Sequence, residues 1–209
     1  MRNFIALWLF CWAPIAAHGQ AYEELLKAVE RGETAAVEAL LERGLDPNTA
    51  DPAGNTILML AARQGKPDMV AMLVRRKASV TRRSPYGDSA LMMASLAGRL
   101  EIAKFLVQHG AEVKHGGWAP LHYAAFEGHA AVVRFLLEKG AQKDALAPNG
   151  YSALMLAARG GHVEAARVLL EEDADLRIKG PAGETALAIA GRRGHKEVAD
   201  LLRRAGAVD

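Results

Sequence analysis

Residues 119–141 read APLHYAAFEGHAAVVRFLLEKGA, with an apolar segment on each side of Gly128. The same pattern returns at residues 152–174, where its parts are easiest to assign. There, residues 154–159 are rich in alanine and predict a first short helix. Gly160 and Gly161 then end that helix, because glycine accepts the positive φ of a helix terminus. Residues 162–171 carry an apolar stripe at helical spacing and predict a second helix.

Three markers keep one register along the chain, which indicates six repeated units. Leucine recurs at Leu25, Leu58, Leu91, Leu121, Leu154 and Leu187, with steps of 33, 33, 30, 33 and 33 residues. Glycine recurs at Gly32, Gly65, Gly98, Gly128, Gly161 and Gly194, and an aliphatic pair follows in each unit. Neither helix of a unit can bury its stripe alone, so we expect neighbouring units to stack into one continuous core.

The two halves of residues 119–141 closely resemble the ankyrin repeat, and the resemblance covers residues 22–209. It implies an all-α repeat solenoid, in which each unit has two antiparallel helices and a short β-hairpin loop that projects sideways. We expect a signal peptide at 1–19 and one repeat domain at 20–209. Its predicted units are an N-terminal cap at 20–50, repeats at 51–83, 114–146 and 147–179, a shortened unit at 84–113, and a C-terminal cap at 180–209.

The chain departs from the family pattern at the start of each first helix. Family units usually have Thr-Pro-Leu-His there, and only His122 keeps the histidine. A Ser or Thr stays in four of five units, so we expect its hydroxyl to cap the helix. The 30-residue step places three missing residues between Ala111 and Trp118, which predicts a shortened hairpin at residues 115–117.

The N-terminus has the order of a secretory signal peptide: Arg2, an almost wholly apolar run at 4–15, then small residues. The run is short for a membrane span, which needs about 20 residues. Cleavage after Gly19 or after Ala21 fits the small-residue pattern, and an uncleaved anchor is the alternative. Cys11 is the single cysteine and lies inside this run, so the mature chain would form no disulfide.

Composition and motifs argue against catalysis and nucleic-acid binding. A formal net charge of +2, with basic and acidic residues interspersed, is far from a nucleic-acid-binding balance. Phosphate-binding glycine loops, HExxH and GxSxG are absent from the sequence. His129, His162 and His195 share one repeat position and would lie roughly 10 Å apart, too far to share a metal ion. His109, His115 and His122 lack a matching carboxylate. We therefore expect no cofactor, no metal site and no enzyme.

The resemblance implies a partner protein on the concave face, which hairpin tips and first helices form in this family. Carried over by position, the expected protein-binding residues have apolar members at the centre of the array and polar ones around them, as in protein interfaces. They are Tyr86, Asp88, Leu96, Trp118, Phe126, Glu127, Tyr151 and Arg159. Trp118 and Phe126 filling a gap in the stack is the alternative.

These features predict a monomeric interaction module in the periplasm, which acts as an adaptor, accessory or inhibitor of another exported protein. A secreted effector that binds a host protein would use the same surface, so the sequence leaves both open. A metal-using enzyme is a remote third reading. The identity of the partner is not encoded in these residues.

Overall fold

The computed structural model describes residues 13–208, with side chains described from residue 19 onward. Within these residues, twelve α helices and one isolated antiparallel bridge between Ala50 and Thr56 make up the regular structure. The first helices of the six units are α1 (Ala13–Arg31), α3 (Ile57–Gln64), α5 (Ala90–Leu96), α7 (Pro120–Phe126), α9 (Ala153–Gly160) and α11 (Ala186–Arg193). The second helices are α2 (Thr34–Glu42), α4 (Pro67–Arg75), α6 (Leu100–Gln108), α8 (Ala130–Glu138), α10 (Val163–Glu171) and α12 (Lys196–Arg204).

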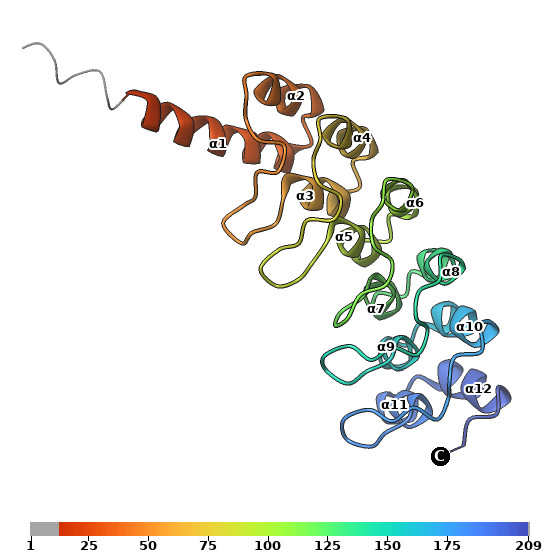
Figure 1. The fold of residues 1–209 in the computed structure, drawn as a ribbon. Helices are drawn as coiled ribbons and strands as arrows, with labels where there is room; N and C mark the ends of the chain where they lie inside the picture. Colours follow the sequence, from red (N-terminus) through yellow and green to blue (C-terminus); the bar gives the residue numbers. More distant parts are fainter. Residues whose placement is uncertain (1–12, 209) are drawn as a thin grey trace, which may run out of the picture.

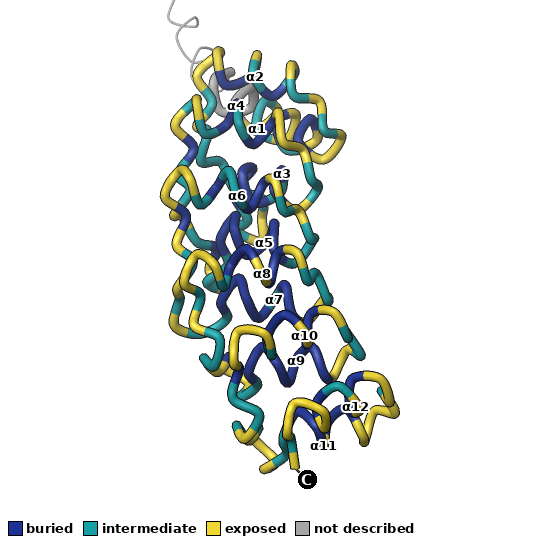
Figure 2. The backbone as a smooth tube through the Cα atoms, turned by 90° about the vertical axis from the view of Figure 1, so that its right-hand side faces the viewer, coloured by how far each residue is buried: buried dark blue, intermediate teal, exposed yellow. Residues whose placement is uncertain are grey.

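The helix pairs stack in chain order, as the repeat period predicts. Each first helix contacts the next first helix, and each second helix contacts the next second helix. Figure 1 shows the second helices along the outside of a gentle curve, with the first helices and the loops on its inside. The buried positions form one hydrophobic cluster that runs through all six units, visible as the dark band in Figure 2. The expected all-α repeat solenoid is confirmed.

Hydroxyl caps start four of the first helices, as expected from the sequence. The side-chain oxygens of Thr56, Ser89, Ser152 and Thr185 each accept the N–H of the third helical residue at 3.2–3.3 Å. Ala119 has no such oxygen. At α7 the N–H of Ala119 instead donates to Nδ1 of His122 at 3.0 Å, so the imidazole takes over the polar contact at this helix start.

Three histidines join successive units at the glycines that end the first helices. Each lies at the start of a second helix, and its Nε2–H donates to the last carbonyls of the preceding unit's first helix. The pairs are His129 with Leu96, His162 with Phe126 and His195 with Arg159, at 3.1, 2.9 and 3.1 Å. The rings lie against Gly98, Gly128 and Gly161, where φ is positive and a Cβ would overlap the imidazole. Their role is structural, as their shared repeat position predicts.

The loops between units are tight turns with little strand pairing. In four of them one backbone bond closes the turn, from the N–H of Asp51, Ser84, Ala147 or Gly180 to the carbonyl four residues later. The loop between α6 and α7 covers only residues 109–119, against 76–89 and 139–152 for its neighbours. Here Nδ1 of His115 donates to the carbonyl of Trp118 at 3.2 Å. This side-chain bond takes the place of the backbone N–H that closes the turn in the other four loops.

The expected signal peptide falls mainly on residues outside the described part of the chain. Helix α1 begins at Ala13 and continues through residues 19–21 without a break, and Leu25, Ala28 and Val29 bury its far end in the stack. Among residues 13–208, no helix is long and apolar enough to cross a membrane. Signal cleavage near residues 19–21 stays a prediction.

Candidate protein-binding face

The candidate site lies on the inner face, which we define as the surface made by α3, α5, α7, α9 and α11 with the loops that precede them. Because these helices stack in order, residues at one repeat position form a column. The column at the end of the first helices holds Arg63, Leu96, Phe126, Arg159 and Arg192. The column just before the helix caps holds Asn55, Asp88, Trp118, Tyr151 and Glu184.

Two of the expected apolar residues are well exposed on this face. The side chain of Tyr86 is 82% exposed at a loop tip, and Phe126 is 43% exposed at the end of α7. Leu96, one unit before Phe126, is half-buried. The carbonyl of Phe126 accepts the Nε2–H of His162, so the backbone that presents this ring is fixed. Apolar side chains therefore occupy the middle of the end-of-helix column.

Trp118 is half-buried and has aromatic neighbours within its own unit. Its ring centroid lies 5.4 Å from that of Tyr123 and 6.0 Å, edge-on, from that of His122. His122 is fully buried, and its Nε2–H donates to the carbonyl of Ala145 at 2.9 Å. Trp118 thus contributes packing to the scaffold and presents only part of its ring to the inner face.

Asp88 has an intramolecular partner. The hydroxyl of Tyr123 donates to Oδ1 of Asp88 at 2.6 Å, across the boundary between two units. Burial raises the pKa of the Tyr123 hydroxyl, and the carboxylate of Asp88 raises this pKa further. Asp88 is half-buried, and its Oδ1 serves a contact between two units.

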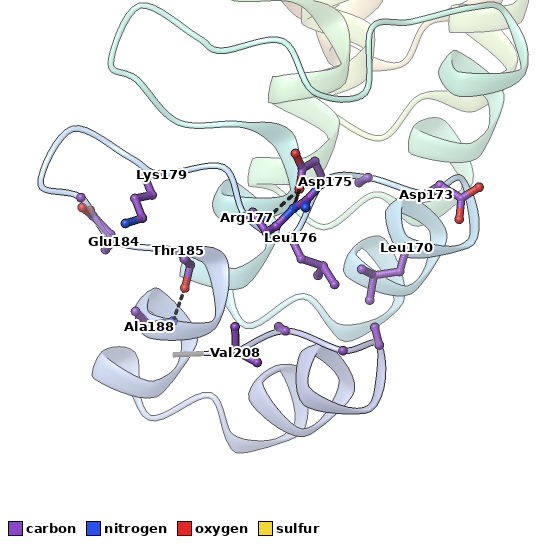
Figure 3. Close-up of a pocket in the computed structure, with 15 residues that line it drawn as sticks. Leu170, Asp173, Asp175, Leu176, Arg177, Lys179, Glu184, Thr185, Ala188 and Val208 are labelled. Atoms are coloured by element: carbon purple, nitrogen blue, oxygen red, sulfur yellow. Dashed lines mark hydrogen bonds and ion pairs between the residues drawn. The ribbon is translucent and has the colours of Figure 1, made fainter.

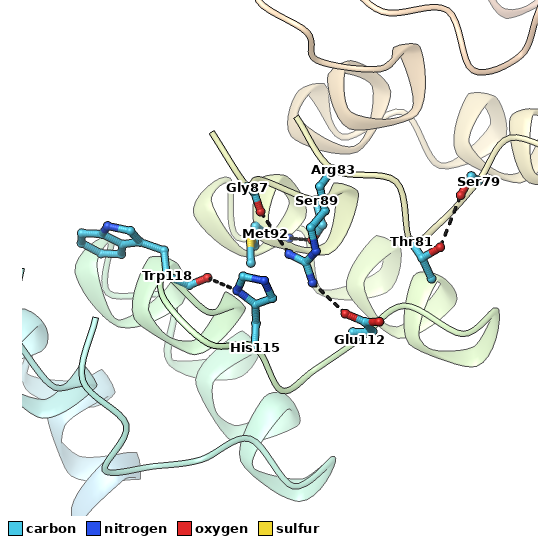
Figure 4. A network of polar contacts seen from close by, with 9 residues as sticks. All are labelled: Ser79, Thr81, Arg83, Gly87, Ser89, Met92, Glu112, His115 and Trp118. Atoms are coloured by element: carbon cyan, nitrogen blue, oxygen red, sulfur yellow. Dashed lines mark hydrogen bonds and ion pairs between the residues drawn. The ribbon is translucent and has the colours of Figure 1, made fainter. Parts of the chain in front are cut away.

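A polar network fixes the loop that carries Tyr86. The guanidinium of Arg83 donates to the carbonyl of Gly87 at 3.0 Å and to Oε2 of Glu112 at 2.7 Å. Figure 4 shows Arg83 between these two groups, with His115 turned toward the carbonyl of Trp118 and the indole pointing away from the network. The contacts of Arg83 therefore hold the tip of the Tyr86 loop, next to the shortened loop, in place.

Tyr151 joins the last two units on the same face. Its hydroxyl donates to Oε1 of Glu184 at 3.1 Å, and the guanidinium of Arg159 lies over its ring at 5.7 Å. The side chain of Glu184 is 7% exposed, and Arg192 approaches its Oε1 to 3.6 Å. The backbone N–H of Glu184 itself, then the Tyr151 hydroxyl, lower the pKa of this carboxyl. Arg159 and Glu127 are both exposed.

Comparison with known protein families agrees with this geometry. The family of ankyrin repeats, described in three copies, matches residues 15–84, 77–147 and 140–208. The chain belongs to the ankyrin repeat family. No curated protein matches the chain. Ankyrin repeats generally mediate protein–protein interaction, and the family is typically a non-enzymatic interaction module.

The histidines of this ankyrin stack are engaged in separate contacts. His109 stacks on Phe105 with ring centroids 4.1 Å apart, His115 contacts Trp118, and His122 is bonded on both ring nitrogens. Burial lowers the pKa of His122, because it disfavours the charged ring, and the bond to the Ala145 carbonyl opposes this shift. Among the described residues, no group of three His, Cys, Asp or Glu side chains could hold a metal ion.

A cavity of the ankyrin stack lies at its C-terminal end, away from the central aromatic residues. Its volume is about 800 Å³, and the loop after α10, the start of α11 and residues 205–208 line it. Figure 3 shows Leu170, Leu176 and Val208 around this cavity, with Lys179 and Glu184 toward the loop tip. This site is separate from the surface around Phe126.

The structure also shows a feature that the repeat positions did not reveal. Leu146 is 48% exposed in the loop before α9, so its side chain adds to the apolar surface of the loops. Leucine is unusual among turn residues, which was the available sequence signal. Of the eight expected residues, Tyr86, Phe126, Glu127 and Arg159 are exposed, and Asp88, Leu96, Trp118 and Tyr151 are half-buried.

Proposed function

We propose that this ankyrin-repeat protein is a non-enzymatic interaction module of the periplasm, which binds a partner protein on its inner face. One observation carries the proposal: Phe126 is exposed at the centre of a column whose ends are arginines. An exposed apolar centre with a charged rim is the usual composition of a protein-binding surface.

The rigidity of the face supports the same proposal. The Phe126 carbonyl is bonded to His162, the Tyr86 loop to Arg83, and the Tyr151 hydroxyl to Glu184. A surface whose backbone is already fixed loses little conformational entropy when it binds. The inner face is therefore suited to hold a partner.

Site-specific photo-cross-linking in the native compartment tests this function. A photoreactive amino acid would replace Phe126 in one variant and Ala131, an exposed residue of α8 on the outer side, in a matched control. We expect a discrete adduct with another protein from position 126 and none from position 131. Equal labelling at both positions would contradict binding on the inner face, and a cytoplasmic adduct would contradict the periplasmic assignment.

A further inference from the structure

The two layers of helices differ in their charge. The first helices α3, α5, α7, α9 and α11 contain four arginines and no acidic residue. The second helices α4, α6, α8, α10 and α12 contain seven basic and seven acidic residues. Several of the latter pair on the outer side, including Lys104 with Glu101 and Arg134 with Glu171. From α3 onward the outer helices are therefore balanced in charge and the inner helices are basic, whereas α1 carries three glutamates.

The arginines of the first helices have few acidic partners. Arg63, Arg159 and Arg193 are exposed and form no ion pair with the described residues. Arg192 lies 3.6 Å from Glu184, which is already bonded to Tyr151. Guanidinium groups bind carboxylates through two parallel hydrogen bonds, which a lysine cannot form. Arg63 and Arg159, which stand in the end-of-helix column, leave that capacity open toward a partner.

The order of charged and apolar residues along the end-of-helix column also indicates the kind of partner. The end-of-helix column reads Arg63, then Leu96 and Phe126, then Arg159 and Arg192. Glu127, exposed beside Phe126, places a negative charge next to the apolar centre. An acidic group on a partner would be repelled at the centre and attracted at both ends.

We infer that the partner presents an acidic segment with an apolar centre and carboxylates on both sides; this rests on the proposed function. Arg63 and Arg159 lie three units apart, about 30 Å at the usual spacing of packed helices. An extended chain covers this distance with about nine residues. Leu96 and Phe126 receive the apolar centre, and the arginines receive the two acidic ends.

Synthetic peptides test this inference directly. The first probe is a fluorescein-labelled peptide with a Leu-Trp-Leu centre and a glutamate triplet at each end. The two triplets lie about nine residues apart along the peptide, to match the distance between Arg63 and Arg159. One comparison peptide has lysine triplets at its ends, and another keeps the glutamates but has a serine centre. Fluorescence anisotropy with the purified protein should show the first probe binding about tenfold more tightly than either comparison. The lysine ends lose charge-assisted contacts, and the serine centre loses buried apolar surface.

Charge-reversal variants identify the residues responsible. Arg63→Glu and Arg159→Glu should each weaken binding of the first probe about tenfold. Arg75→Glu is the matched control, because Arg75 is exposed at the end of α4 on the outer side. It should leave binding unchanged, and circular dichroism melting should show that all three variants are folded.

The outcomes separate this inference from the proposed function. Equal binding of glutamate- and lysine-ended peptides, or no binding of the first probe, would overturn the acidic partner. So would an effect of Arg75→Glu as large as that of Arg63→Glu, or tighter binding of a labelled DNA duplex. Cross-linking from position 126 could still succeed in each of these cases, and it alone decides whether the inner face binds a protein.

Discussion

His122 provides a quantitative test of how the stack is held together beneath the inner face. Replacing it by methionine, the residue at the same position in three other units, keeps a long apolar side chain in the buried site. It removes two contacts, the bond from the Ala119 N–H at 3.0 Å and the bond to the Ala145 carbonyl at 2.9 Å. The Ala145 carbonyl would then lack this partner, and the Ala119 N–H would have only a weak sulfur acceptor, like the one that the Thr56 N–H finds in Met59 Sδ at 3.4 Å.

The expected cost follows from these two groups. A buried polar group left without a partner costs about 1–3 kcal/mol. With the apolar volume largely kept, His122→Met should lower the free energy of unfolding by about 2–4 kcal/mol. For a chain of this size this corresponds to a fall in the melting temperature of roughly 5–15 °C.

The pH dependence gives the same prediction a second readout. Burial lowers the pKa of His122 below its ordinary value of 6.5. Between these two values the unfolded chain binds a proton that the folded chain does not, so the folded state loses stability as the pH falls. The contribution of the neutral His122 is complete above about pH 6.5 and is lost as the pH falls through the folded pKa. The cost of His122→Met should therefore be smaller at about pH 5 than at about pH 7.5.

Urea unfolding of the wild type and the variant at both pH values measures these differences. Adding Ala119→Ser to His122→Met should recover about 1 kcal/mol, because it recreates the serine cap and methionine of α5 and α9. A cost below about 0.5 kcal/mol, or one that grows as the pH falls, would refute the hydrogen-bonding role of His122.

Three further predictions concern the face and the N-terminus. Trp118→Ala should lower the free energy of unfolding by about 1–2 kcal/mol, less than a fully buried aromatic residue would, because Trp118 is half-buried against Tyr123. Phe126→Ala should lower it by about 0.5 kcal/mol or less, because Phe126 is exposed. Thermal melting that ranks the two variants in reverse would be inconsistent with their burial. Asp88→Asn should let Tyr123 ionise at lower pH in an alkaline absorbance titration, since the carboxylate helps to raise that pKa; an unchanged titration would exclude the coupling. Intact mass of the exported protein should place its N-terminus at Gln20 or Tyr22, and retention of Cys11 would indicate an anchored form.

The fold could be predicted from the sequence because its period is explicit. Leucine, glycine and the aliphatic pair keep one register, so helices, breaks and stacking order follow from a single unit. The histidines after Gly128, Gly161 and Gly194 could also be assigned a structural role, because a shared repeat position means a shared contact. Their acceptors, the carbonyls one unit earlier, required the structure.

The candidate face was only partly predictable, because repeat position gives direction and not burial. Phe126 and Trp118 both fall on the expected columns, yet Trp118 packs against Tyr123 and Phe126 is exposed. Asp88 reads as a free surface acid in the sequence, and its bond to Tyr123 depends on contact between units. The basic character of the first helices was visible residue by residue. Its contrast with the balanced second helices emerged once the helix bounds were known.

The affinity of the cross-linked partner for Phe126→Ala tests the central claim most directly. Isothermal titration would compare the wild type, Phe126→Ala and the outer-face control Arg75→Glu. Binding on the inner face predicts that Phe126→Ala weakens affinity about thirtyfold, the scale of a central interface residue, with an almost unchanged melting temperature. Arg75→Glu should leave the affinity unchanged. Unchanged affinity of Phe126→Ala would contradict the claim that the partner binds around this residue.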